Sequence, residues 1–244
     1  MNVQDIVALI VVYLIIASAL GLSLYVQKKG INWDNRKVIH IGVGAFIYVW
    51  WAFTANWVML VFFSVPFAIL LFFAMFPGNP VSDSKLGEVT NDMGHRYGLF
   101  LYVITINIMV AFFFDDSCLG GEHWLAATLG IVAMTRGDGF GSIIGKKYGK
   151  HKLIHGKSLE GSIGVFAFTA VISIFVIMLY GFLYTTLPDY GILVNAATVG
   201  IVSAVGYSLL AGTIATVVEA IAPGDFDNLL ISLCVAVPLV LLGL

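Results

Sequence analysis

The sequence predicts an all-α fold, a polytopic transmembrane bundle of about eight helices (seven to nine). Hydrophobic residues make up 60% of the 244 positions and charged residues only 11%, whereas a soluble domain carries about 25% charged residues. Uncharged runs such as 6–26 and 162–188 are long enough to cross roughly 30 Å of hydrocarbon as helices. We therefore treat residues 1–244 as one integral membrane domain.

Apolar runs and the residues that break them predict the individual helices. We expect helices at residues 5–26, 38–54, 57–76, 98–114, 122–135, 160–184, 191–219 and 229–244. The first run is too long for the core of a signal peptide, so we expect it to be retained. Gly200, Gly206 and Gly212 favour close helix packing within the seventh stretch. We expect the catalytic residues in the connections at 27–40, 77–97, 136–161 and 219–228.

The positive charges indicate how the chain is threaded. With eight helices, every Lys and Arg falls in an alternate connection. The twelve are Lys28, Lys29, Arg36, Lys37, Lys85, Arg96, Arg136, Lys146, Lys147, Lys150, Lys152 and Lys157. The positive-inside rule makes that side cytoplasmic and puts both termini outside. Insertion topology alone is the alternative explanation for basic connections.

Residues 136–161 form the densest polar stretch, with seven glycines and six basic residues. Glycine lets backbone N–H groups approach phosphate oxygens, lysine neutralises phosphate charge, and a carboxylate can hold a divalent ion or orient a hydroxyl. The pattern is neither a Walker A motif nor GxGxxG. Candidates for binding phosphate are Gly139, Gly145, Lys146, Lys147, Gly149 and Lys157, with Asp138 as the first candidate for metal or hydroxyl.

Ser158 and Glu160 have a structural alternative. Ser158 is suited to cap the following helix, and Glu160 in its first turn suits the helix dipole. Capping does not exclude a functional role, because a helix N-terminus also attracts anions.

Two further clusters carry polar residues next to apolar helices. Arg36 and His40 are four residues apart and share a helix face with Lys37 beside it; the basic pair alone is also typical of a snorkelling helix end. His40 lies a turn deeper, so its side chain should face the bundle interior. Three carboxylates and an amide at the end of the seventh stretch suggest a metal or phosphate role, with a charge-balanced connection as the alternative; they are Glu219, Asp225, Asp227 and Asn228.

These motifs together resemble the polyprenol kinase family, which includes phytol, farnesol and dolichol kinases and CTP-dependent diacylglycerol kinases. The matches are Arg36-Lys37-Val38-Ile39-His40, Gly137-Asp138-Gly139, Ile144 to Lys150, Lys157 to Gly161, Glu219 and Asp227-Asn228, in the family's order. The chain departs from the pattern where Phe226 replaces an expected acid and Gly141 replaces a small or acidic residue.

The resemblance implies a membrane-embedded kinase that transfers the terminal phosphate of a nucleotide, expected to be CTP, to an isoprenoid alcohol reached from the bilayer. A divalent cation, expected to be Mg²⁺, would assist. The implied catalytic residues are Asp138, Lys157, Glu160 and His40, and the implied metal ligands are Asp138, Glu160, Glu219 and Asp227. The implied nucleotide or phosphate contacts are Arg36, Lys37, Gly139, Gly145, Lys146, Lys147, Gly149, Ser158 and Asn228.

Several alternatives stay open. The chain could be a diacylglycerol kinase or a related cytidylyltransferase, although the long acidic signature of CDP-diacylglycerol synthases is absent. An anion transporter is disfavoured because the charges gather at one face and no repeat is evident. We expect nucleotide and membrane lipids as partners and no nucleic acid; the oligomeric state, the alcohol's chain length and the choice of CTP over ATP are open.

Overall fold

The computed structural model describes residues 2–31, 35–91, 97–114, 123–187 and 193–244. Helices and short connections account for this part of the chain, and no β-strand occurs in it. The helices are α1 (Val3–Lys28), α2 (Asn35–Val43), α3 (Asn56–Met59), α4 (Val65–Ala74), α5 (Lys85–Thr90), α6 (Gly98–Phe113), α7 (Trp124–Val132), α8 (Gly139–Tyr148), α9 (Leu159–Thr186), α10 (Val194–Thr198), α11 (Ile201–Ile221) and α12 (Asp227–Leu241). Single π-helical segments at 60–64 and 133–138 join α3 to α4 and α7 to α8.

The surface of the bundle suits a membrane. Five helices of the described chain are long and apolar enough to span one, at Val3–Lys28, Asn56–Ala74, Leu159–Thr186, Ile201–Ile221 and Gly224–Leu241. Apolar side chains on them are widely exposed, for example Leu14 at 61% and Val171 at 65%. Soluble proteins rarely expose so much apolar surface, so the predicted helical membrane bundle is confirmed as a fold class.

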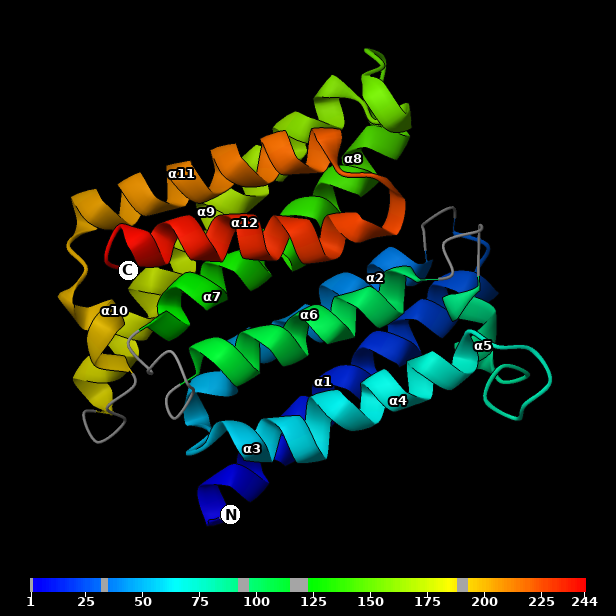
Figure 1. Cartoon of the computed structure of the whole chain (residues 1–244), viewed down its shortest axis with the longest axis horizontal. Helices are drawn as coiled ribbons and strands as arrows, with labels where there is room; N and C mark the ends of the chain where they lie inside the picture. Colours follow the sequence, from blue (N-terminus) through cyan, green and yellow to red (C-terminus); the bar gives the residue numbers. More distant parts are fainter. Residues whose placement is uncertain (1, 32–34, 92–96, 115–122, 188–192) are drawn as a thin grey trace.

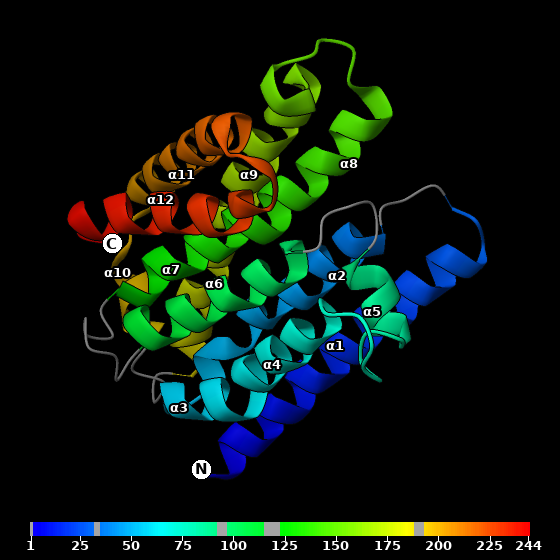
Figure 2. The same cartoon turned by 45° about the vertical axis from the view of Figure 1, so that its right-hand side comes forward.

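The two ends of the bundle differ (Figure 1). The start of α2, α5, the α8–α9 connection and the α11–α12 turn lie at one end, which we call the polar end. Both chain termini, α3 and α10 lie at the other end, and the turned view agrees (Figure 2). The described part of the chain therefore gathers its basic connections on one side, as predicted; Arg96 lies outside the described residues. Which side faces the cytoplasm stays a prediction.

The predicted helix 38–54 is wrong beyond residue 43. The chain changes there to short 3₁₀ segments at 44–48 and 50–52. The first 3₁₀ segment packs closely on the π segment at 133–138, where a Cβ on Gly44 would lie 2.5 Å from the Cβ of Thr135. Arg136 is drawn into the bundle and donates a hydrogen bond to the carbonyl of Ile41, in the last turn of α2.

The predicted connection 136–161 is mostly helix. The π segment and α8 carry the helix to Tyr148, and only residues 149–158 connect it to α9. The glycines of α8 are packing positions: a Cβ on Gly141 would lie 2.4 Å from Val165 Cγ2, and one on Gly145 would lie 2.9 Å from Ser158 Oγ. A glycine-rich segment therefore forms a close α8–α9 contact where an open phosphate loop was expected.

Smaller differences concern two other stretches. The connection 77–97 contains the short helix α5, and its residues 92–96 lie outside the described part. The stretch 191–219 divides into α10 and α11. Close packing is confirmed for Gly212, whose Cβ would lie 3.0 Å from the Phe166 carbonyl oxygen, and is wrong for Gly200 and Gly206, which have open space around them.

Candidate active site

Four segments far apart in the sequence meet at the polar end and surround a cavity of about 440 Å³. They are the start of α2, the π segment with α8, the connection that leads into α9, and the α11–α12 turn. The charged residues that line the cavity are Arg36, Lys37, Lys146, Lys152, Lys157, Asp138, Glu219 and Asp227. Five basic against three acidic side chains leave a net positive wall, which favours a polyanionic ligand.

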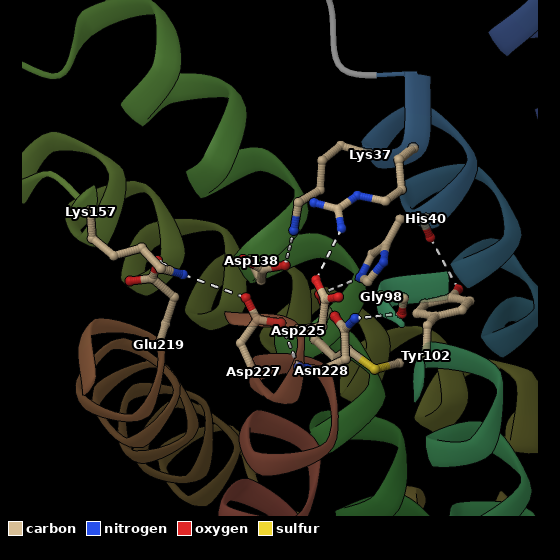
Figure 3. A network of polar contacts seen from close by, with 12 residues as sticks. Lys37, His40, Gly98, Tyr102, Asp138, Lys157, Glu219, Asp225, Asp227 and Asn228 are labelled. Carbon is tan, nitrogen blue, oxygen red and sulfur yellow. Dashed lines mark hydrogen bonds and ion pairs between the residues drawn. The ribbon is translucent and has the colours of Figure 1, made fainter. Parts of the chain in front are cut away.

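A buried ion pair lines this cavity. Lys37 Nζ donates to Asp138 Oδ2, and the two side chains are only 8% and 1% exposed. Lys37 comes from the first turn of α2, and Asp138 ends the π segment. Burial of two charges is costly unless they are paired, so each residue fixes the position of the other (Figure 3).

A second cluster joins α9 to the α11–α12 turn. Lys157 Nζ lies 2.7 Å from Glu219 Oε1 and 3.5 Å from Asp227 Oδ2. Burial alone would lower the pKa of the Lys157 ammonium, but the carboxylates around it outweigh this and raise its pKa above the usual range. Lys157 therefore stays charged at neutral pH. Ser162 Oγ donates to the other oxygen of Glu219 at 3.3 Å.

His40 faces the bundle interior, as predicted. Its Nε2 lies 3.0 Å from the Met134 carbonyl oxygen, to which it donates in the matching tautomer. Its ring packs against that of Tyr102 at 4.2 Å between centroids, and Tyr102 Oη donates to the His40 carbonyl at 3.0 Å. These contacts fix His40 at the edge of the cluster (Figure 3).

A small pocket of about 30 Å³ adjoins the large cavity. It shares Arg36, Lys37 and Asp227 with the cavity and adds His40, Gly98, Asp225 and Asn228. Arg36 Nη1 pairs with Asp225 Oδ1 at 3.3 Å, and Asn228 Nδ2 donates to the Gly98 carbonyl at 2.9 Å. Asn228 lines this pocket, and no donor among the described residues reaches its buried Oδ1.

Several residues predicted from the sequence lie apart from this cluster. The Glu160 carboxylate accepts the N–H groups of Lys150 and His151 at 3.0 and 3.3 Å and pairs with His151 Nδ1 at 2.7 Å, so it braces the 149–158 connection. Lys147 is exposed over the Tyr148 ring. Gly145 lines the large cavity, whereas Lys147, Gly139 and Gly149 do not. The Ser158 side chain accepts the Gly161 N–H at 3.2 Å, which confirms the predicted helix cap.

The carboxylates fit the chemistry of a magnesium ion. Asp138 and Asp227 line one cavity with Glu219, and hard oxygen donors are the ligands that Mg²⁺ prefers. Within the described ranges, no three His, Cys, Asp or Glu side chains converge as a complete metal cage. This is compatible with Mg²⁺, which is usually held by one or two carboxylates together with substrate phosphates.

Two residues of the site received no role from the sequence: Tyr102 supports His40, and Ser162 supports Glu219. Asp225, predicted as part of the acidic cluster, pairs with Arg36. Tyr102 and Ser162 lie inside apolar helices, where no local pattern marks them out.

Two curated proteins resemble this chain over most of its length. The chain is 31% identical over 176 residues to a phytol kinase of Synechocystis sp., a match that covers 70% of this chain and 67% of the relative. It is 30% identical over 210 residues to a probable chloroplastic phytol kinase of Triticum aestivum, covering 82% of this chain and 64% of the relative. The chain thus matches about two thirds of each relative's length.

The chain belongs to the polyprenol kinase family, in the group represented by phytol kinases. No family model matches the sequence, and no solved structure matches it. The resemblance seen in the motifs is confirmed by these relatives.

Proposed function

We propose that the protein is a membrane-embedded kinase that transfers the terminal phosphate of a nucleoside triphosphate, CTP as the expected donor, to an isoprenoid alcohol. One observation carries the proposal: charged side chains from four segments, including the Lys37–Asp138 and Lys157–Glu219 pairs, line one cavity with excess positive charge. The kinship with phytol kinases supplies the reaction class.

The position of the cavity suits two substrates of opposite polarity. A nucleotide arrives from water, and a long-chain alcohol arrives from the bilayer. The cavity opens at the polar end of helices whose outer faces are apolar. Both substrates can therefore meet at the membrane surface.

Charge stabilisation and positioning are the main contributions of a protein to phosphoryl transfer. Lys37, Lys146 and Lys157 would bind the phosphates, and Arg36 would neutralise further charge. The alcohol oxygen forms a bond to the terminal phosphorus, the bond from that phosphorus to the bridging oxygen breaks, and CDP leaves. The hydroxyl proton passes to a carboxylate, for which Asp138 and Asp227 are the candidates.

A magnesium ion would be held by Asp138 and Asp227, with Glu219 as a further ligand, and would neutralise charge on the phosphates. Lys37 and Lys157, the lysine partners of these carboxylates, also line the cavity. The lysines can therefore bind the phosphates while the carboxylates bind the metal. Glu160 is not included in this ligand set, because its carboxylate braces the 149–158 connection.

The test uses purified protein in detergent with magnesium. CTP and ATP, each labelled at the α or the γ phosphate, are crossed with phytol, geranylgeraniol, farnesol, a long polyprenol and diacylglycerol. We expect γ label in one isoprenyl monophosphate. Label in phosphatidate would indicate a diacylglycerol kinase, α label in lipid a cytidylyltransferase, and nucleotide turnover without lipid product would revive the transporter alternative.

A further inference from the structure

An apolar groove with a cavity of about 210 Å³ lies between α1, α2, α4, α5 and α6. Side chains of Leu20, Ile39, Phe67, Leu99, Tyr102 and Val103 line it. Ser23 and Lys85 line it as well, and both belong to the polar end of the bundle. The groove is therefore apolar along its length and polar at one end. This distribution suits an amphipathic ligand that has an apolar chain and a polar head.

The groove and the charged site share their walls. In α2, Ile39 lines the groove and the next residue, His40, lines the small pocket. In α6, Leu99 lines the groove and the preceding residue, Gly98, lines the small pocket. Tyr102 lines the groove and His40 lines the small pocket, and their rings are in contact with centroids 4.2 Å apart.

The small pocket matches the size and chemistry of an alcohol head. Its volume of about 30 Å³ exceeds the ~10–15 Å³ that one water molecule requires. Asn228 lines this pocket, and its buried Oδ1 is an acceptor that the described residues leave unpaired. A hydroxyl group would donate to this oxygen and would lie next to Asp227 and Lys37, which also line the nucleotide cavity.

We propose that the hydrocarbon chain of the isoprenoid alcohol lies in the apolar groove between α1, α4 and α6, with its hydroxyl in the small pocket beside Asn228. This assignment rests on the proposed function for the identity of the alcohol. The groove follows α1 from Ile16 to Leu24, about 12 Å at the rise of an α-helix. A long polyprenyl chain exceeds this length, so its far end stays among the membrane lipids.

The groove therefore recognises the isoprene units nearest the hydroxyl. Saturation or branching in those units should change the KM for the alcohol. Added units at the far end should change it little.

Photolabelling of the wild-type protein is the first test. The probe is a C20 isoprenoid alcohol with a diazirine in its second isoprene unit, applied in detergent and followed by peptide mapping. We expect label on α1 residues 16–24 and α6 residues 99–106, removed by excess phytol. Label confined to another face, or groove label that phytol does not displace, overturns the proposal; the second result would assign the groove to acyl chains of bulk lipid.

A substitution gives the second test. Leu20→Trp, at a partly exposed groove position, should raise the KM for the alcohol at least about tenfold, the range that a misfit in a hydrophobic pocket produces. The KM for the nucleotide should not change. Val171→Trp, on the exposed face of α9, is the matched control and should leave both constants unchanged.

The two proposals fail in different ways. If Leu20→Trp has the wild-type KM for the alcohol, the groove assignment fails while the kinase activity stands. If displaceable groove labelling is found but no phosphate is transferred to any alcohol, the groove assignment stands and the kinase proposal fails.

Discussion

Lys157 and Glu219 form an ion pair of 2.7 Å that ties the entry of α9 to the end of α11. Asp227 Oδ2 lies 3.5 Å from the same ammonium, so one positive charge organises two carboxylates of different segments. The turn between α11 and α12 is thereby fixed against the 149–158 connection. The shape of the cavity depends on this link.

Replacement of Lys157 tests whether its charge serves the substrate as well as the fold. Lys157→Met should lower kcat/KM for the nucleotide by at least about 100-fold, the loss typical of removing a group that stabilises developing charge. Lys29→Met is the control, because Lys29 lies at the same end over the Tyr25 ring and should have wild-type kinetics. A folded Lys157→Met protein with normal kcat/KM would contradict the assignment.

The Lys37–Asp138 pair predicts how single and double substitutions change the free energy of unfolding. Lys37→Gln or Asp138→Asn alone leaves a buried charge without its partner, which typically costs about 3–5 kcal/mol. The double variant removes both charges and should recover most of that loss. Thermal unfolding in detergent measures all three variants. Additive losses in the double variant would show that the two side chains do not depend on each other.

Magnesium dependence separates the carboxylates. Asp227→Asn should raise the Mg²⁺ concentration that gives half-maximal activity, because Asp227 lines the large cavity in which we propose that Mg²⁺ and nucleotide bind. Glu160→Gln should leave that concentration unchanged and instead make the 149–158 connection more sensitive to protease, since Glu160 holds the N–H groups of Lys150 and His151. If Glu160→Gln raised that Mg²⁺ concentration and Asp227→Asn did not, Glu160 would be a metal ligand and Asp227 would not.

Two glycines in helices test the packing of α8 on α9. A Cβ on Gly141 would lie 2.4 Å from Val165 Cγ2 and 2.9 Å from the Gly161 carbonyl oxygen, whereas a Cβ on Gly206 meets nothing within 4 Å. Gly141→Ala should destabilise the protein by about 1–3 kcal/mol through overpacking. Gly206→Ala should be neutral or stabilising by up to about 1 kcal/mol. Equal unfolding temperatures for the two variants would contradict the close contact.

Composition and charge were enough to predict the helical membrane class and the gathering of basic connections at one end. Hydropathy fixes which segments leave water, so α1 and α9 were predicted to within a few residues. The helix α8 was missed because its glycines and lysines are typical of a loop. Only the facing residues, such as Val165 and Ser158, show that the glycines permit close packing.

Residue patterns identified most of the charged cluster but not its internal pairing. Arg36, Lys37, Asp138, Lys157, Glu219 and Asp227 do line one cavity. Because a loop was expected, the sequence could not separate the roles of Lys146 and Lys147. Both lie in helix α8, where Lys146 lines the cavity and Lys147 lies over the Tyr148 ring outside it. Tyr102 could not be predicted, because its role depends on α6 crossing α2 beside His40.

The most direct test of the central claim is the formation of isoprenyl monophosphate from γ-labelled CTP by the Lys37→Gln/Asp138→Asn double variant beside the wild-type protein. Both must first show cooperative unfolding in the same detergent. We predict labelled lipid from the wild-type protein and a loss of at least about 100-fold in the double variant. A folded double variant that forms the product at the wild-type rate would show that phosphoryl transfer occurs elsewhere.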